Sequence, residues 1–146
     1  MDVRRYEPQI FAAGASLRIY GAGIDIDDLT REFGYIPDHQ RKAGDPDPGK
    51  RPYPHDMWSL ASPLGKDQDL EVHLNWLAEK FLRHTQYIHS LRQKFQVDIY
   101  CWKNCFTEQA SLTLSPQALR VFTELSTPFC VSLIFLPDEH DNVLTP

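Results

Sequence analysis

The sequence predicts an α+β fold. We expect a two-layer sandwich in which a mixed, mostly antiparallel sheet of about five strands carries its helices on one face. Three observations lead to this prediction: several short segments alternate apolar and polar residues, one long segment repeats its apolar residues with helical periodicity, and a short link suited to a hairpin joins two of the strands. The predicted order of elements is β-α-β-α-β-β-α-β.

The length and composition fit one domain over residues 1–146, with 42% hydrophobic and 24% charged residues. We expect a core over about 15–136, an irregular proline-rich loop at 35–54 and a polar tail at 137–146. The net charge of −5 argues against a general binder of nucleic acid or of an anionic membrane. No apolar run approaches the length of a membrane span, and the predicted location is the cytoplasm.

The first predicted strand covers residues 15–21, ASLRIYG. Leu17 and Ile19 lie on one face of this strand, and Ser16, Arg18 and Tyr20 lie on the other. Since successive side chains of a strand point to opposite faces, this alternation is typical of a half-buried strand.

A helix follows, beginning after Asp25 as its N-cap and ending at Gly34. Asp27 and Asp28 fall in its first turn, where the helix dipole favours negative charge. The three aspartates could instead bind a divalent ion, but a calcium loop needs more oxygen ligands with wider spacing, so capping is the preferred interpretation.

Prolines dominate residues 35–54, where neither a helix nor a central strand is expected. The basic residues of this region are Arg41, Lys42, Lys50 and Arg51. Nearby aspartates cancel their charge, namely Asp38, Asp45, Asp47 and Asp56. Binding of phosphate or nucleic acid by this loop is therefore weakly supported unless folding separates the two signs.

The segment HDMWSLAS, residues 55–62, is the second predicted strand, with Trp58 and Leu60 on one face. Trp58 is expected in the core because tryptophan carries a large apolar area, and a clamp on a ligand is the alternative.

The strongest helical signal begins near Leu70 and reaches Phe95. A continuous helix of this length would extend about 39 Å, which is longer than a small domain is wide. We therefore expect either a bend near residues 84–86 or a projection beyond the core. The histidines at 73, 84 and 89 lack the spacing of a shared helical metal site.

Two further strands are predicted at 96–103 and 110–115, joined as a hairpin by residues 104–108. Ser115 and Pro116 are a typical start for a third helix. The last predicted strand, residues 129–137, is apolar on both faces and is therefore expected at the centre of the sheet.

No cofactor or metal site is predicted. The three cysteines Cys101, Cys105 and Cys130 lie in apolar surroundings and are expected as reduced, buried thiols. The polar tail contains Asp138, Glu139, His140 and Asp141, but adjacent residues cannot all converge on one ion, so this cluster is expected in solvent.

Several segments together resemble a bacterial family of uncharacterised small proteins, domain of unknown function 4279. The matching pieces are SLRIYG, DIDDLTREFG with YIP behind it, RKAGD, MWSLAS, the long helix from Leu70, and SLTLSPQAL. The likeness covers nearly the whole chain, from about Ala15 to Leu136. The resemblance implies a fold and no catalytic set. Some small families of this kind look like immunity proteins, which bind a cognate toxin.

The first functional hypothesis is a non-enzymatic protein-interaction module, for example an immunity-type inhibitor of a toxin. The sequence contains no phosphate-binding glycine loop, nucleophile elbow or HExxH motif. The 35–55 loop offers Tyr35, Tyr53 and His55 to a protein partner. The long helix could add a second surface or the contact of a homodimer.

The second hypothesis is a small anionic-ligand-binding domain that uses the same region. It requires Arg18, Arg41, Lys42 and Trp58 to converge on one concave pocket. The alternative for Arg41 and Lys42 is ordinary solvated charge.

Overall fold

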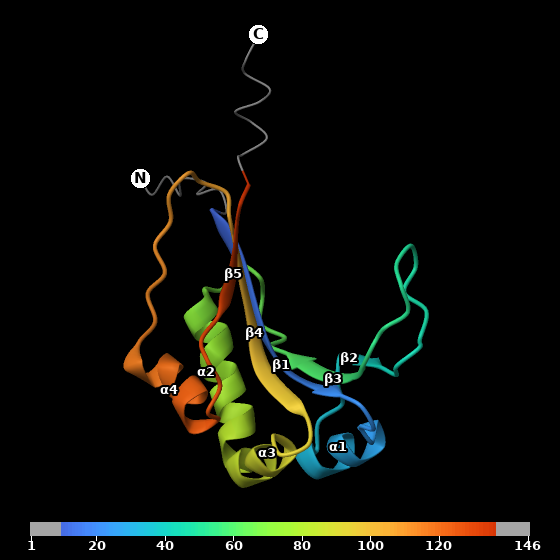
Figure 1. Cartoon of the computed structure of the whole chain (residues 1–146). Helices are drawn as coiled ribbons and strands as arrows, with labels where there is room; N and C mark the ends of the chain where they lie inside the picture. Colours follow the sequence, from blue (N-terminus) through green and yellow to red (C-terminus); the bar gives the residue numbers. More distant parts are fainter. Residues whose placement is uncertain (1–9, 137–146) are drawn as a thin grey trace, which may run out of the picture.

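The predicted α+β class is confirmed. The computed structural model describes residues 10–136, which form a mixed sheet with helices packed on one of its faces (Figure 1). The sheet has five strands in the order β2-β3-β1-β4-β5, and only the β4–β5 pair is parallel.

The central strand is β1 (Phe11–Gly21), which pairs antiparallel with β3 (Asp56–Ala61) on one side and with β4 (Gln96–Cys105) on the other. It begins earlier than predicted because the small residues before Ser16 continue the pairing with β4 as far as Phe11. Ala13, Ala15, Leu17 and Ile19 are buried on its helix-facing side.

The helix α1 (Ile26–Phe33) has the predicted ends. Asp25 caps it by accepting a hydrogen bond from the backbone N–H of Asp28, 3.1 Å long, and Gly34 closes it in the left-handed conformation at φ 76°. The capping interpretation of Asp25 is thus confirmed.

The long amphipathic segment bends, which is one of the two expected outcomes, and the break at residues 82–84 adjoins the expected position at 84–86. It consists of α2 (Leu70–Phe81), a 3-10 turn, η1 (Leu82–His84), and α3 (Thr85–Leu91). The Thr85 hydroxyl donates to the Leu82 carbonyl over 2.7 Å at the bend. Because the segment bends, both helices keep their apolar faces on the sheet instead of projecting past it.

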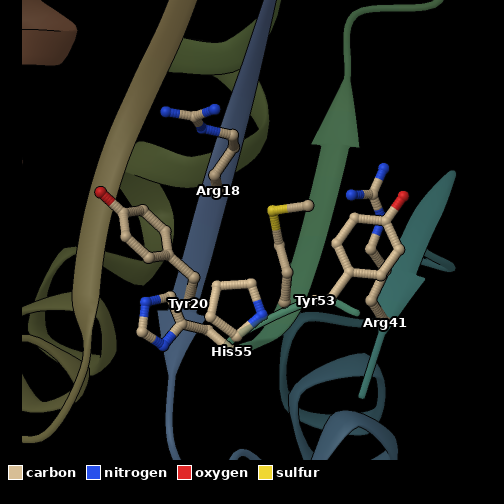
Figure 2. A pocket seen from close by; sticks show the side chains of 7 residues that line it. Arg18, Tyr20, Arg41, Tyr53 and His55 are labelled. Atoms are coloured by element: carbon tan, nitrogen blue, oxygen red, sulfur yellow. The ribbon is translucent and has the colours of Figure 1, made fainter. Parts of the chain in front are cut away.

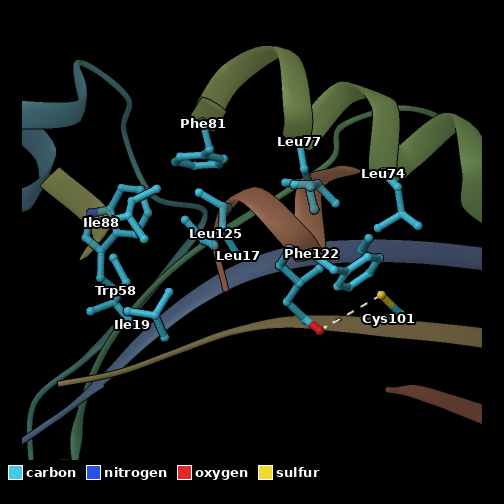
Figure 3. Close-up of a cluster of buried hydrophobic side chains, with 14 of the residues drawn as sticks. Leu17, Ile19, Trp58, Leu74, Leu77, Phe81, Ile88, Cys101, Phe122 and Leu125 are labelled. Atoms are coloured by element: carbon cyan, nitrogen blue, oxygen red, sulfur yellow. Dashed lines mark hydrogen bonds between the residues drawn. The ribbon is translucent and has the colours of Figure 1, made fainter. Parts of the chain in front are cut away.

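The large side chains of α2 pack onto the central strands and Trp58 (Figure 3). Trp58 is fully buried, with its ring centre 5.0 Å from that of Phe33 and 6.4 Å from that of Phe81. Its indole N–H donates to the Thr30 hydroxyl over 3.2 Å, so its polar atom is also satisfied. The prediction that Trp58 belongs to the core is confirmed.

Two strand predictions were wrong in detail. Residues 110–115 are not a strand, because the position beside β4 is taken by β5 (Val131–Phe135), and residues 106–115 instead form an irregular connection to α4 (Pro116–Glu124). The proline-rich region, where only a loop was expected, contains the short edge strand β2 (His39–Arg41). The observed order is therefore β-α-β-β-α-α-β-α-β.

The last strand was predicted at the centre of the sheet, and it lies at an edge. Its apolar side chains are half exposed; for example, Leu133 retains 46% and Phe135 retains 49% of its surface. The helices do not cover this end of the sheet (Figure 1). Apolar character on both faces of β5 thus does not reflect burial within one chain.

Replacing Leu74 by alanine should lower the free energy of unfolding by about 3 kcal/mol, because a fully buried leucine leaves a cavity. Val72→Ala on the same helix should change it by less than about 0.5 kcal/mol, because Val72 is exposed. Urea denaturation of both variants measures the difference. Equal effects at the two positions would contradict the packing of α2 on the sheet.

Candidate functional site

The sheet face opposite the helices forms the candidate site. Alternation along the strands places polar and aromatic side chains on this face, with the core side chains behind them. They are Arg41 from β2, Met57 from β3, Arg18 and Tyr20 from β1, and Asp98, Tyr100 and Trp102 from β4. No helix within residues 10–136 packs over them (Figure 1).

Arg18 and Asp98 form a paired centre on this face. The guanidinium donates two hydrogen bonds to the carboxylate, 2.8 Å and 2.7 Å long, and the Tyr20 hydroxyl donates a third of 3.2 Å. The hydrogen bond to Asp98 raises the pKa of Arg18 against the opposing effect of burial. The Arg18 guanidinium also lies 4.7 Å from the ring centre of Tyr100. Its charge is therefore largely compensated within the chain.

The charge of Arg41, unlike that of Arg18, is not compensated by a carboxylate among the described residues. Its guanidinium carbon lies 3.7 Å from the ring centre of Tyr53, which is a close cation–π stack. Among residues 10–136 no carboxylate forms an ion pair with Arg41. This side chain is thus held flat by an aromatic ring while its charge stays available.

A cavity of about 270 Å³ lies between these groups (Figure 2). Its lining residues are Arg18, Tyr20, Arg41, Tyr53, Pro54, His55 and Met57. A second hollow of about 320 Å³ adjoins it and shares Tyr20 and His55, whose ring centres are 6.5 Å apart. The second hollow adds Arg92 and Lys94, so two neighbouring depressions both have cationic side chains in their walls.

The irregular loop that carries Tyr53 is fixed by Asp56. This buried carboxylate accepts backbone hydrogen bonds from Ala43 (2.8 Å) and Ile24 (3.0 Å), and the Lys42 ammonium lies 3.6 Å from it. The bonds from the two backbone N–H groups, with Lys42, lower the pKa of Asp56. Asp56 thus joins both ends of the loop to the turn after β1.

Four of the seven predicted site residues line the cavity: Arg18, Arg41, Tyr53 and His55. The small-ligand hypothesis also required Lys42 and Trp58 to converge on this cavity, and neither of them lines it. Trp58 stands opposite Gln40 in the β2–β3 pair and points into the core, while its neighbour Met57 faces the cavity. Lys42 turns away to donate to the Ile24 carbonyl.

Tyr35 also lies away from the cavity. It packs against Phe81 on the helix side, and its hydroxyl donates to the Lys80 carbonyl over 3.1 Å. Tyr35 therefore packs against the last turn of α2 and is not available on the open face.

The sequence reasoning missed Tyr20 and Met57 in the cavity, and Tyr100 and Trp102 on the same face of the sheet. Tyr20 could have been predicted, because the alternation of apolar and polar residues along residues 15–21 already placed it on the face opposite the core. Trp102 lies directly over Gly14, where an added Cβ would come within 2.6 Å of the indole. Glycine at this position lets the ring lie flat on the sheet.

The other reactive groups of the described residues do not gather into a metal site. Within residues 10–136 no group of three or more histidine, cysteine or acidic side chains could hold a metal ion. Burial raises the pKa of Cys101 to about 12, and Cys105 is buried as predicted, but Cys130 is exposed. The cluster at Asp138, Glu139, His140 and Asp141 lies outside the described residues.

His73 was expected to be solvated or half-buried, and the structure buries it completely. Its Nδ1 lies 2.8 Å from the Ser62 hydroxyl and its Nε2 lies 3.1 Å from the Gln68 carbonyl, so it fastens the loop between β3 and α2. Burial lowers its pKa, which favours the neutral ring.

A family model described as "Domain of unknown function (DUF4279)" matches residues 9–136. No curated protein and no solved structure gave a significant match. In the described part of the chain no helix has the length and apolar character to span a membrane.

Replacing Asp56 by asparagine should lower the free energy of unfolding by about 2 kcal/mol at neutral pH, because two backbone donors lose a charged acceptor. The folded-state pKa of Asp56 is below its ordinary value of 3.8, so its stabilisation is present above that value and is lost as the pH falls further. The variant and the native chain should therefore converge in acid. Urea denaturation across pH tests this, with Glu32→Gln, an exposed position on α1, as control. A difference that persists in acid would contradict the assignment.

Proposed function

The chain belongs to the DUF4279 family, whose description assigns no activity, and we propose that it is a non-enzymatic protein-interaction module that binds its partner on the open face of the sheet. The observation that carries this proposal is the uncovered layer of arginine, tyrosine, tryptophan and methionine side chains from four neighbouring strands. These residue types are enriched in protein interfaces, and arginine, tyrosine and tryptophan dominate the residues that contribute most binding energy.

The rigidity of this face supports the proposal. Arg18 is held by Asp98 and by two tyrosine rings, and Trp102 lies on the sheet over Gly14. Side chains that are already fixed lose little conformational entropy when a partner binds. The layer therefore offers a preorganised contact surface.

Arg41 supplies the charge of the proposed contact. Its guanidinium lies on Tyr53 with no ion-pair partner among the described residues, and it borders the cavity. A carboxylate of the partner could accept two parallel hydrogen bonds from it. We therefore propose a partner that places an acidic side chain at Arg41 and an apolar one beside Met57.

An immunity-type inhibitor is one form of this proposal. Such a protein blocks a toxin by occupying its surface and needs no chemistry of its own. The protruding loop between β2 and β3 could extend the contact beyond the sheet (Figure 1). Co-expression with a toxin encoded beside the gene would test this form separately from partner binding in general.

Arg41→Glu should weaken partner binding by about 30-fold or more, because it removes the proposed hydrogen bonds and opposes the partner's carboxylate. The measurement is co-purification from the native cell at physiological salt, followed by titration of the isolated partner. Arg51→Glu is the matched control, since Arg51 lies on the loop that follows β2, is exposed and does not line the cavity.

Loss of binding in both variants would indicate a general charge effect and count against the proposed site. Recovery of no partner with the intact chain, or equal recovery with Arg41→Glu, would also contradict it. Circular dichroism verifies that each variant keeps its fold.

A second candidate is a small anionic ligand in the cavity. The volume of about 270 Å³ lies just below the usual range for drug-sized ligands, which suits a smaller anion, and Tyr20 and Tyr53 provide aromatic walls. This candidate retains Arg18 and Arg41 from the predicted set and omits Lys42 and Trp58.

Benzoate is a suitable probe for this candidate because it combines a carboxylate with a flat ring. We expect a saturable NMR shift of the Arg41 Nε–H signal that Tyr53→Ala abolishes, since the stack on Tyr53 orients the guanidinium. Inorganic phosphate tests whether the charge alone is sufficient. Absence of saturation with both probes would remove the small-ligand candidate and leave the protein-partner proposal in place.

A further inference from the structure

The two edges of the sheet differ in how they are protected. The β2 edge is a strand of three residues, His39–Arg41, and it carries charge. The β5 edge is longer and contains only apolar residues and one serine. Short length and charge are the usual protection against pairing with another chain, and β5 has neither.

The exposed apolar surface concentrates at β5. Of the eleven large hydrophobic residues that are exposed in the described chain, five fall within the eight residues from 129 to 136. They are Phe129, Leu133, Ile134, Phe135 and Leu136. Alternation distributes these side chains over both faces of the strand, so this edge of the sheet is apolar on both sides. Such a concentration of exposed apolar residues marks an interaction site more often than scattered exposed residues do.

The backbone of β5 has a free edge. Leu136 donates its N–H to the Cys105 carbonyl over 2.7 Å, toward β4. Because backbone groups alternate in direction along a strand, the N–H and C=O groups of Val131, Leu133 and Phe135 point away from β4. Within residues 10–136 no strand pairs with that side.

We propose that a second copy of the chain occupies this edge, with the two β5 strands pairing antiparallel across a two-fold axis at Leu133. This register makes Leu133 exchange both backbone hydrogen bonds with its own copy and places Val131 opposite Phe135 of the other chain. All outward-pointing backbone groups of the strand are then paired. The two sheets become one continuous sheet.

Charge and symmetry favour a second copy over an unrelated strand. Residues 126–136 contain no charged side chain, so the two-fold axis brings no like charges together. Val131, Leu133 and Phe135 share one face of β5, and each copy supplies apolar cover to the same residues of the other. The surface therefore complements itself.

The test is sedimentation of the intact chain and two variants. The native chain should sediment with twice the 16.9 kDa mass of one chain. Leu133→Lys should raise the dimer Kd by about 100-fold or more, because it places like charges together at the axis. Val72→Lys, an exposed apolar position on α2, should leave the dimer intact. Leu133 is half exposed, so the fold should tolerate the change, and circular dichroism verifies this.

A second measurement tests the register without adding charge. In a Cys130→Ser background, Leu133→Cys should cross-link to its own copy under oxidation, because each position 133 faces the other at the axis. Ser132→Cys should not, because that register places it opposite Ile134. A monomeric native chain overturns the proposal. So does a dimer lost with Val72→Lys and kept with Leu133→Lys, which would instead place the contact on the long helix.

Discussion

The burial of only one face of the sheet is the constraint on which the rest of this structure depends. The helices cover one side of β1, β3 and β4, where Leu17, Ile19 and Trp58 lie. Because a strand alternates its side chains, every residue next to a core position faces the open side. Arg18, Tyr20 and Met57 are thus placed together by the same packing that buries their neighbours. The apolar core and the candidate binding surface are two sides of one arrangement.

A second constraint gives this surface its shape. The proline-rich loop has little regular structure, yet it brings Tyr53 under Arg41 because Asp56 holds the backbone at Ala43 and Ile24. A buried carboxylate is costly unless it is hydrogen bonded, and here backbone donors and Lys42 satisfy it. The cancelled charges of the loop are therefore separated in space. Lys42 forms an ion pair with the buried Asp56, while the Arg41 guanidinium lies at the cavity without an ion-pair partner among the described residues.

The sequence predicted features that depend on local periodicity and failed where a second strand decides the outcome. Alternation correctly placed Arg18 on the face opposite the core and Trp58 within it, and the cap at Asp25 followed from local rules. The break in the long helix was one of two outcomes expected from its length. The pairing of Gln40 with Trp58 sets Arg41 and Trp58 on opposite faces, and this register has no local signature. Similarly, residues 110–115 have a strand-like pattern, but β5 occupies the place beside β4.

The position of β5 connects these errors to the proposed assembly. An apolar strand at the centre of a sheet is buried on both faces, and residues 129–137 have that composition. Within one chain the strand lies at the edge and leaves its leucine and phenylalanine side chains half exposed. In the two-fold pairing proposed above, β5 would lie in the middle of a continuous sheet. That pairing would satisfy the free backbone groups of β5 and set apolar side chains of the two copies side by side, which is consistent with the absence of charge from this strand.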